Sequence, residues 1–312
     1  MKAILSIGLN PTMQKTLVFS GLVSDTVNRA VSHRLDASGK GINVCRVLTQ
    51  LGKNSVHLSQ LGGRFRPVFL DLCAADGLNV EWVESQSQIR FCYTLIDSVD
   101  RSVTELVEEG EEVESGTEAR LIDAYKKLLP GISTVIFSGS KAAGFSDSLM
   151  GEMVKLAKSN SIRIILDIRG KDLLNSLQHK PDIIKPNLVE FASTFAPELI
   201  VKNKIPDVPE VKSRIEGLCV ELCNKYNTGI VLTRGAKSIW YMDKSSSLGN
   251  SFSEFKIDCF EPLNTTGSGD AFTAGMASAL EEGKSLGQAV AEGARCGGLN
   301  ALLLRPGVIR EH

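Results

Sequence analysis

The chain has 312 residues, of which 43% are hydrophobic and 23% charged, a length that suits one large α/β domain with a small appendage. Its 35 basic and 36 acidic residues nearly cancel, which argues against nucleic acid or an anionic membrane surface as a partner. The seven scattered cysteines form no CxxC pair, and the apolar run before Asn10-Pro11 is too short for a signal sequence or a membrane span. We therefore expect a reduced, cytoplasmic protein.

Short apolar or β-branched runs alternate with helical patterns along the chain, as is typical of a parallel α/β sheet. The predicted strands cover residues 3–9, 55–61, 134–139, 162–168, 182–187 and 229–235, and the predicted helices include residues 42–52, 118–131 and 146–160. Ligands of such sheets bind beyond the carboxyl ends of the strands. The residues that follow each strand are therefore the candidates for chemistry.

Two segments, residues 12–36 and 89–107, break this rhythm because apolar and polar residues alternate in them. Such alternation predicts strands with one buried face, so we expect a β-hairpin in each segment. Together the hairpins would form a small lid over the edge of the main sheet. Their exposed apolar faces favour a homodimer formed through the lid.

The segment LNTTGSGDAFTAG (263–275) places one carboxylate after a run of small residues. Gly267, Ser268 and Gly269 allow close backbone approach and open a helix whose free N–H groups favour an anion. Such a hole would stabilise a transferring phosphoryl group, and Asp270 could accept the proton of an attacking hydroxyl. Alternatively, Asp270 only complements the helix dipole; this segment alone favours neither role.

A second glycine cluster, DASGKGINVCRVLTQLG (36–52), also leads into a helical pattern. It is not a Walker P-loop, because Gly41 follows Lys40 where Ser or Thr is required. The first segment is not a dinucleotide-binding motif either, because GSGDAF lacks the last glycine of GxGxxG. An oxidoreductase therefore has little support. Lys40 remains a candidate phosphate partner, and Asn43 is either a hydrogen-bonding group for vicinal hydroxyls or a residue that starts a helix.

The third segment, IIKPNLVE (183–190), places a lysine at the end of a buried strand pattern. Asn187 and Glu190 share one face if a helix starts after the proline. An acid and an amide beside Lys185 suit a magnesium ion that keeps several waters and binds nucleotide phosphates. A capped helix start explains Asn187 equally well.

In order and spacing, these three segments resemble the PfkB carbohydrate kinase family over essentially the whole chain. LNTTGSGDAF is similar to the C-terminal signature, GKGINVCRVLTQLG to the N-terminal signature and KPNLVE to the NxxE motif. The resemblance implies a ribokinase-like three-layer α/β/α sandwich with a mainly parallel sheet and a small β-sheet lid, as a single domain over residues 1–312. It also implies ATP and Mg²⁺ as cofactors and Asp270 as the catalytic base.

The expected site follows from the same resemblance. We expect Lys185, Thr233 and Gly235 to bind the nucleotide, and Asn187 and Glu190 to hold Mg²⁺ through water. Within the family the chain is most similar to the sugar-phosphate branch, the 1-phosphofructokinases and tagatose-6-phosphate kinases, through Leu9-Asn10-Pro11, Val27-Asn28-Arg29, RLDASGKGINV, Thr104-Glu105-Leu106 and Ser138-Gly139-Ser140. The substrate-binding residues implied by this branch are Gln14, Arg29, Gly39, Lys40, Asn43, Arg90 and Ser138, with Arg29 reaching a partner subunit.

Three departures from the branch fall near the expected sugar pocket. Gln14 stands where an aspartate normally accepts hydrogen bonds from sugar hydroxyls, Cys92 where an asparagine is usual, and Lys141-Ala142 where Leu-Pro is usual. The nucleotide and base motifs are intact, so we expect a kinase with an altered acceptor.

The leading hypothesis is ATP-dependent phosphorylation of a ketose phosphate, either fructose 1-phosphate or tagatose 6-phosphate. Two alternatives stay open, a kinase of an unphosphorylated sugar or nucleoside and a non-catalytic sugar-phosphate sensor. The sequence does not distinguish the acceptor, the phosphorylated position or the donor nucleotide.

Overall fold

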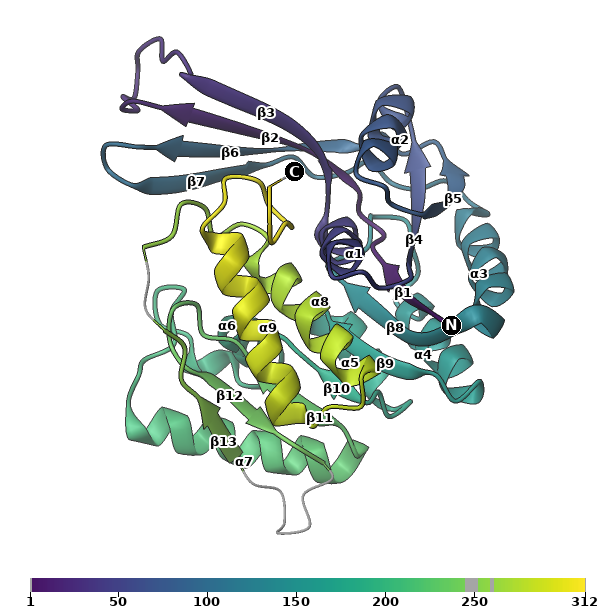
Figure 1. The fold of residues 1–312 in the computed structure, drawn as a ribbon. Helices are drawn as coiled ribbons and strands as arrows, with labels where there is room; N and C mark the ends of the chain where they lie inside the picture. The colour runs from purple at the N-terminus through teal and green to yellow at the C-terminus, as the bar shows by residue number, and fades with distance from the viewer. Residues whose placement is uncertain (1, 245–251, 259–260, 312) are drawn as a thin grey trace.

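The computed structural model describes residues 2–244, 252–258 and 261–311. These residues form a nine-stranded sheet in the order β13-β12-β11-β10-β9-β8-β1-β4-β5, with helices on both faces (Figure 1). All neighbours from β11 to β5 pair in parallel, whereas β11, β12 and β13 pair antiparallel. The strands are β1 (Ala3–Ile7), β4 (Ser55–Gly62), β5 (Val80–Ser85), β8 (Ile132–Ser138), β9 (Arg163–Asp167), β10 (Ile183–Ile184), β11 (Gly229–Leu232), β12 (Ile239–Met242) and β13 (Phe252–Phe255).

Two cores separate the sheet from its helices, because successive strand side chains point to opposite faces. Ile4 and Ile136 pack towards one helix layer, and their neighbours Leu5 and Phe137 pack towards the other. The first layer consists of α1 (Lys40–Gln50), α8 (Ser268–Glu281) and α9 (Leu286–Ala301). The second layer consists of α3 (Thr117–Leu128), α4 (Leu149–Ser159), α5 (Gly170–Leu177), α6 (Leu188–Phe195) and α7 (Pro209–Tyr226). The expected three-layer α/β/α architecture is confirmed.

A separate small sheet, in the order β3-β2-β6-β7, confirms the two expected hairpins. Its strands are β2 (Thr12–Phe19), β3 (Ser32–Ser38), β6 (Arg90–Asp97) and β7 (Ser102–Val107). The hairpins β2–β3 and β6–β7 are antiparallel, and β2 joins β6 in parallel. Helix α2 (Arg66–Ala75) packs beside its base in a third core.

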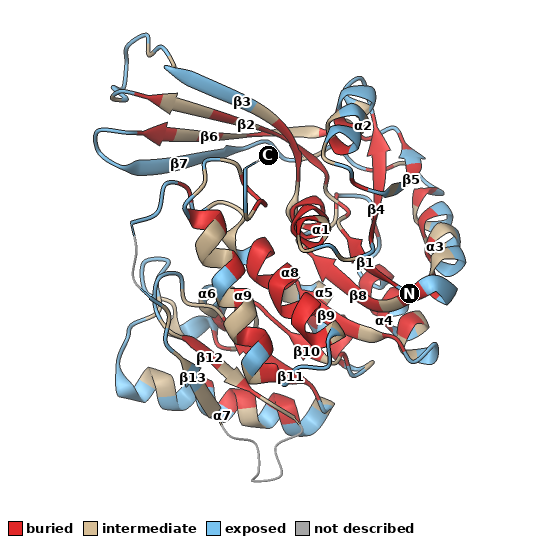
Figure 2. Ribbon diagram, in the orientation of Figure 1, coloured by how far each residue is buried: buried red, intermediate tan, exposed pale blue. Residues whose placement is uncertain are grey.

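The two faces of this small sheet differ. Gln14, Asp36 and Thr94 share one face and are buried. The opposite, outer face carries Leu17 and Leu95, which are partly exposed, and Leu106. Figure 2 shows α8 as buried and β7 as exposed.

Local chemistry explains where the observed elements differ from the predicted ranges. The helix predicted over 118–131 ends at Leu128 and continues as a 3₁₀ turn, Leu129–Gly131, because Pro130 has no N–H to donate. The strand predicted over 182–187 is only Ile183–Ile184, because Pro186 has no N–H to donate to the ladder, and beyond it Asn187 forms only an isolated bridge with Thr233. Within the described residues, no helix is both long and apolar enough to cross a membrane.

Candidate active site

A cavity of about 440 Å³ lies beyond the carboxyl ends of β1, β8 and β9. The loop after β1, the start of α1, the first residue of β6 and residues of α5 and α6 also line it. This is the position at which parallel sheets bind ligands. The charged residues of the wall are Lys40, Arg90, Asp167, Arg169, Asp172 and Glu190.

Asp270 lies in the first turn of α8, which begins after Gly267. Gly267 has φ 82°, and a Cβ there would lie 2.5 Å from the backbone nitrogen of Gly307, so only glycine fits both the conformation and the space. The Asp270 side chain is buried, with 5% of the residue exposed. Burial raises the pKa of Asp270 to about 7, against the lowering effect of Lys40. A carboxylate with that pKa suits general-base chemistry near neutral pH.

Asn43, in the first turn of α1, holds Asp270 directly. Its Nδ2 donates a hydrogen bond of 2.8 Å to Asp270 Oδ2. Its Oδ1 accepts hydrogen bonds from Ser38 Oγ at 3.1 Å and from Arg46 Nη1 at 3.0 Å. Asn43 therefore does more than start a helix, because both ends of its amide are used to orient the carboxylate.

Asp167, at the end of β9, joins two of the expected cations. Its Oδ1 lies 3.6 Å from Lys40 Nζ, and its Oδ2 lies 3.3 Å from Lys185 Nζ and accepts a 2.9 Å hydrogen bond from Thr273. Burial would raise the pKa of Asp167, but Lys185 and Lys40 hold it below its usual value. Asp167 raises the pKa of Lys40 in turn. Asp167 was not among the residues predicted from the sequence, although an acid at the end of the strand predicted over 162–168 was an available signal.

Asn187 and Glu190 form a capping box at the start of α6. Asn187 Oδ1 accepts from the Glu190 backbone N–H at 2.8 Å, and Glu190 Oε2 accepts from the Asn187 backbone N–H at 2.9 Å. The remaining carboxylate oxygen, Glu190 Oε1, lies 3.5 Å from Lys40 Nζ. Glu190 thus faces the cavity, whereas the side-chain oxygen of Asn187 is engaged in capping.

The other expected nucleotide residues lie near α6. Lys185 is 2% exposed, and its Nζ lies 5.7 Å from the centre of the Phe272 ring. Thr233 forms a bridge with Asn187, and Gly235 makes the following turn with φ 63°. These residues flank the carboxyl end of β11.

Most of the expected substrate residues line the cavity. Gly39, Lys40, Arg90 and Ser138 are part of its wall. Arg90 Nη1 donates to the Glu108 carbonyl at 3.1 Å, while its Nε is buried and has no hydrogen-bond partner in the part of the chain that the structure describes. The cavity wall therefore contains a guanidinium group with unused donor capacity.

Three expected substrate residues are not part of this wall: Asn43, which holds Asp270, and Gln14 and Arg29. Gln14 is buried in the small sheet, where its Nε2 donates to Thr94 Oγ1 at 2.8 Å and where Cys92 is its register partner on β6. Arg29 is exposed in the loop between β2 and β3. Gln14, Cys92 and Arg29 do not line the cavity. They belong to the small sheet and its loop, which extend away from the main sheet (Figure 1).

The third departure, Lys141, forms an ion pair with Asp172 of α5. Asp172 and Arg169 line the cavity, and neither was predicted from the sequence. Arg169 precedes α5 and is exposed to the cavity. A basic residue directly after the strand predicted over 162–168 was the available signal for it.

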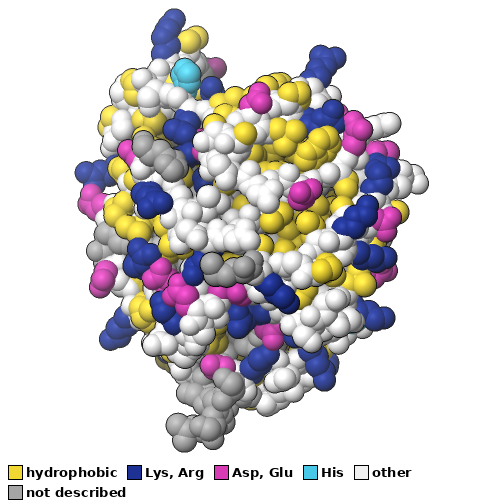
Figure 3. All heavy atoms as spheres, turned by 45° about the vertical axis from the view of Figure 1, so that its right-hand side comes forward, with side chains coloured by type: hydrophobic (Ala, Val, Ile, Leu, Met, Phe, Trp, Pro, Cys, Tyr) yellow, Lys and Arg dark blue, Asp and Glu magenta, His cyan; other side chains and the backbone are white. Residues whose placement is uncertain are grey.

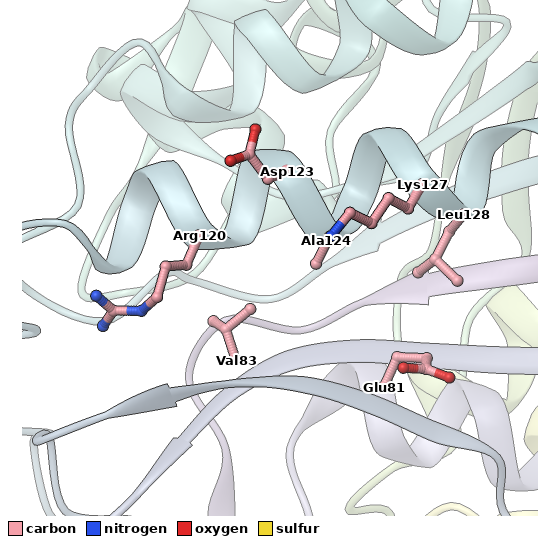
Figure 4. A pocket seen from close by; sticks show the side chains of 7 residues that line it. All are labelled: Glu81, Val83, Arg120, Asp123, Ala124, Lys127 and Leu128. Atoms are coloured by element: carbon pink, nitrogen blue, oxygen red, sulfur yellow. The ribbon is translucent and has the colours of Figure 1, made fainter.

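A second cavity of about 460 Å³ lies between α3 and β5 (Figure 4). The charged side chains that line this second cavity are both acidic and basic, and one of them, Arg120, forms an ion pair of 2.5 Å with Glu114. No residue expected in the active site lines it. On the face shown in Figure 3, acidic and basic side chains are intermixed in the same way.

The chain matches the model of the pfkB family of carbohydrate kinases over residues 2–307. Among solved structures, phosphofructokinase-2 from Escherichia coli in complex with fructose-6-phosphate is 20% identical, with a TM-score of 0.82, and the match covers 97% of this chain and 94% of that chain. A possible 1-phosphofructokinase from Thermotoga maritima is also 20% identical, with a TM-score of 0.82, coverage 97% and 93%. Ribokinase from Thermotoga maritima is 15% identical, with a TM-score of 0.72, coverage 98% and 95%. These structures share the fold of this chain.

Proposed function

Because the chain belongs to the pfkB family of carbohydrate kinases and is a sugar kinase, we propose that it transfers the γ-phosphoryl group of ATP to a hydroxyl of a ketose phosphate. Fructose 1-phosphate and tagatose 6-phosphate are the leading acceptors. The observation that carries this proposal is Asp270, a buried carboxylate at the start of α8 with a pKa of about 7 and a fixed hydrogen bond from Asn43.

Asp270 accepts the proton of the acceptor hydroxyl as its oxygen attacks the γ-phosphorus. The new O–P bond forms while the bond to the β,γ-bridging oxygen breaks, and ADP leaves with that electron pair. The transferring group carries negative charge throughout, so positioning and electrostatics dominate the catalysis. The backbone N–H groups at the start of α8, after Gly267, supply the stabilising dipole.

Lys185, Thr233 and Gly235 hold the nucleotide in this proposal. Within the described residues, Asp167 Oδ1 is buried without a hydrogen-bond partner apart from its ion pair with Lys40, and Asp167 lines the same cavity as Glu190. Carboxylate oxygens are the ligands Mg²⁺ prefers, so these two residues fit the ion of Mg·ATP, with Asn187 reaching it only through water. The ion supplies neutralisation of phosphate charge when it is bound.

Arg90 and Arg169 support an acceptor that already carries a phosphate. Both guanidinium groups line the cavity, and the acidic wall residue Asp172 is paired with Lys141 outside it. Arginine forks match phosphate oxygens in a bidentate way. Escherichia coli phosphofructokinase-2, which shares the fold of this chain, has been crystallised in complex with fructose-6-phosphate. That ligand is of the same class as the proposed acceptor.

The whole chain acts in this proposal as one kinase domain, with the small sheet as its lid and as a dimer interface. The loop between β2 and β3 exposes Val27 at 79% and Val31 at 65%, and Leu106 on the outer face is 51% exposed. Apolar surface of this kind favours a partner copy. Arg29, exposed in the same loop, would then reach the site of the partner subunit.

A coupled ADP-release assay tests this function over a panel of ketose phosphates, aldose phosphates, free sugars and nucleosides. The proposal expects kcat/KM to be highest for a ketose phosphate and to fall when Arg90 is replaced by alanine. Highest activity on an unphosphorylated sugar, with Arg90→Ala unchanged on it, contradicts the proposed acceptor. Binding of sugar phosphates without ADP release contradicts the enzyme activity itself.

A further inference from the structure

Arg46 is a buried guanidinium that the proposed chemistry does not use. It lies on α1, one turn after Asn43, and 1% of the residue is exposed. Its Nε donates to Asp76 Oδ2 at 2.8 Å, its Nη2 to the Ala37 carbonyl at 2.5 Å and its Nη1 to Asn43 Oδ1 at 3.0 Å. A buried ion pair is often no more stable than apolar residues of the same volume, so stability alone is a weak reason for an arginine here.

The contact with Asn43 decides how the amide is oriented. An amide can present either its oxygen or its NH₂ group to a neighbour, and Ser38, as a hydroxyl, can satisfy either. Arg46 has only donors, so it can form a hydrogen bond with the oxygen of the Asn43 amide but not with its NH₂ group. The Asn43 NH₂ group is therefore directed at Asp270 whether or not that carboxyl carries a proton.

Arg46 is itself held by residues that do not contact Asp270. Asp76, which follows α2, pairs with Arg46 and also with Arg305 Nη2 at 2.5 Å. Arg305 Nε lies 2.8 Å from Asp36 Oδ1 on β3. The chain of contacts thus runs from the small sheet and the C-terminal loop to the carboxylate of Asp270.

We propose that Arg46 is a positioning residue for the general base, which acts by fixing the Asn43 amide so that its NH₂ group always donates to Asp270. This inference rests on the proposed function, in which Asp270 is the base. The other charged groups that face Asp270 are Lys40, Lys185 and Asp167, and none of them contacts Arg46 in the hydrogen bonds or ion pairs of the described chain.

The test compares the pH dependence of kcat in the full-length wild type and in Arg46→Met, at saturating ATP and ketose phosphate. Without Arg46 the amide can turn and accept a hydrogen bond from protonated Asp270. We expect the acid limb of kcat to move up by about one pH unit, the order of one charge-assisted hydrogen bond. On that shift kcat falls about tenfold at pH 6 and about fivefold at pH 7, and it recovers above pH 9. The KM for ATP should stay within about threefold, because Arg46 does not line the cavity.

A matched control is Arg163→Met. Arg163 pairs with Glu281 at 3.2 Å and begins β9, at the end of the strand away from Asp167 and the cavity. This variant should leave the acid limb in place even if it lowers the melting temperature. An Arg46→Met profile that overlays the wild type, or a loss of kcat by the same factor at every pH, overturns the proposal. If Arg46→Met does not fold, Arg46→Gln is measured instead. Its amide can accept as well as donate, so the Asn43 amide is no longer fixed, the limb should move in the same direction, and an unmoved limb overturns the proposal.

Asp270→Asn separates this inference from the function on which it rests. If that variant keeps wild-type turnover, the proposed base is wrong and the role of Arg46 fails with it. If Asp270→Asn is inactive and Arg46→Met has the wild-type profile, only the role of Arg46 fails.

Discussion

The Asn43 side chain donates a 2.8 Å hydrogen bond to Asp270 across 227 positions of sequence. This contact joins α1 to α8 and brings the two glycine-rich segments of the chain together at one carboxylate. It opposes the effect of burial, which raises the pKa of Asp270 to about 7. The following predictions depend on that balance and on the charges around it.

Removal of the Asp270 charge should stabilise the protein at alkaline pH. The folded pKa of about 7 is above the reference of 3.8, so the stability linked to the protonated form is lost as pH rises through 7. A shift of this size, which already includes the attraction to Lys40, corresponds to at most about 4 kcal/mol. We expect on the order of 2 kcal/mol for Asp270→Asn at pH 8, because the buried asparagine NH₂ group must itself be desolvated. Urea unfolding should show this gain at pH 8 and a smaller one at pH 5. A larger gain at pH 5 contradicts the raised pKa.

Asp167→Asn should destabilise the fold and the nucleotide side of the site together. Lys185 is 2% exposed and would lose the carboxylate 3.3 Å away. Removal of one partner of a buried pair typically costs about 3–5 kcal/mol. The exposed pair of Lys171 and Asp147 is the control, and Lys171→Ala should change the free energy of unfolding by less than about 0.5 kcal/mol. Equal denaturation midpoints for the two variants would show that Asp167 does not hold Lys185.

Arg169→Ala should raise the KM for the ketose phosphate by about tenfold or more, since a charge-assisted contact contributes roughly 1.5–3 kcal/mol. The KM for ATP and the melting temperature should change little. Arg214 on α7 is also exposed and provides the control substitution to alanine. Steady-state kinetics with each substrate varied in turn decides the matter. An unchanged KM for the acceptor removes Arg169 from the phosphate site.

Gly267→Ala should lower both kcat and stability. The left-handed φ of 82° alone costs an L-residue about 1–2 kcal/mol, and the added Cβ would also displace Gly307 from a distance of 2.5 Å. Gly283, after the other end of α8, has φ 77° but open space around its Cβ, so Gly283→Ala reports the conformational cost alone. The difference in melting temperature between the two variants measures the clash. No difference means that the contact with Gly307 is dispensable.

The sequence predicted both hairpins and all the parallel strands except β5, because their apolar periodicity is local. It also indicated Asp270 as a candidate base, since an acid after a glycine turn is a pattern within a few residues. The links that organise the site are not local. Arg305 meets Asp36 across the fold, and Asp167 meets Lys40 and Lys185 only when three segments converge. No periodicity in a single segment encodes such charge pairing.

The departures from the family pattern show the same limit. Gln14 and Cys92 were expected near the sugar pocket, but strand pairing places them as neighbours inside the small sheet. Lys141 was also expected near the sugar pocket; it does not line the cavity but forms an ion pair with the wall residue Asp172. The register of one strand against another decides which side chain faces a cavity, and register is a property of the assembled sheet.

The most direct test of the proposed chemistry is the steady-state kinetics of Asp270→Asn with the preferred ketose phosphate and with ATP, each varied in turn. Asparagine preserves the volume of the side chain and its acceptor for Asn43 but cannot take a proton. We expect kcat to fall by about 10²–10⁴-fold, the usual effect of losing a general base, with the KM for ATP unchanged. A kcat within threefold of the wild type would contradict the role of Asp270 as the base.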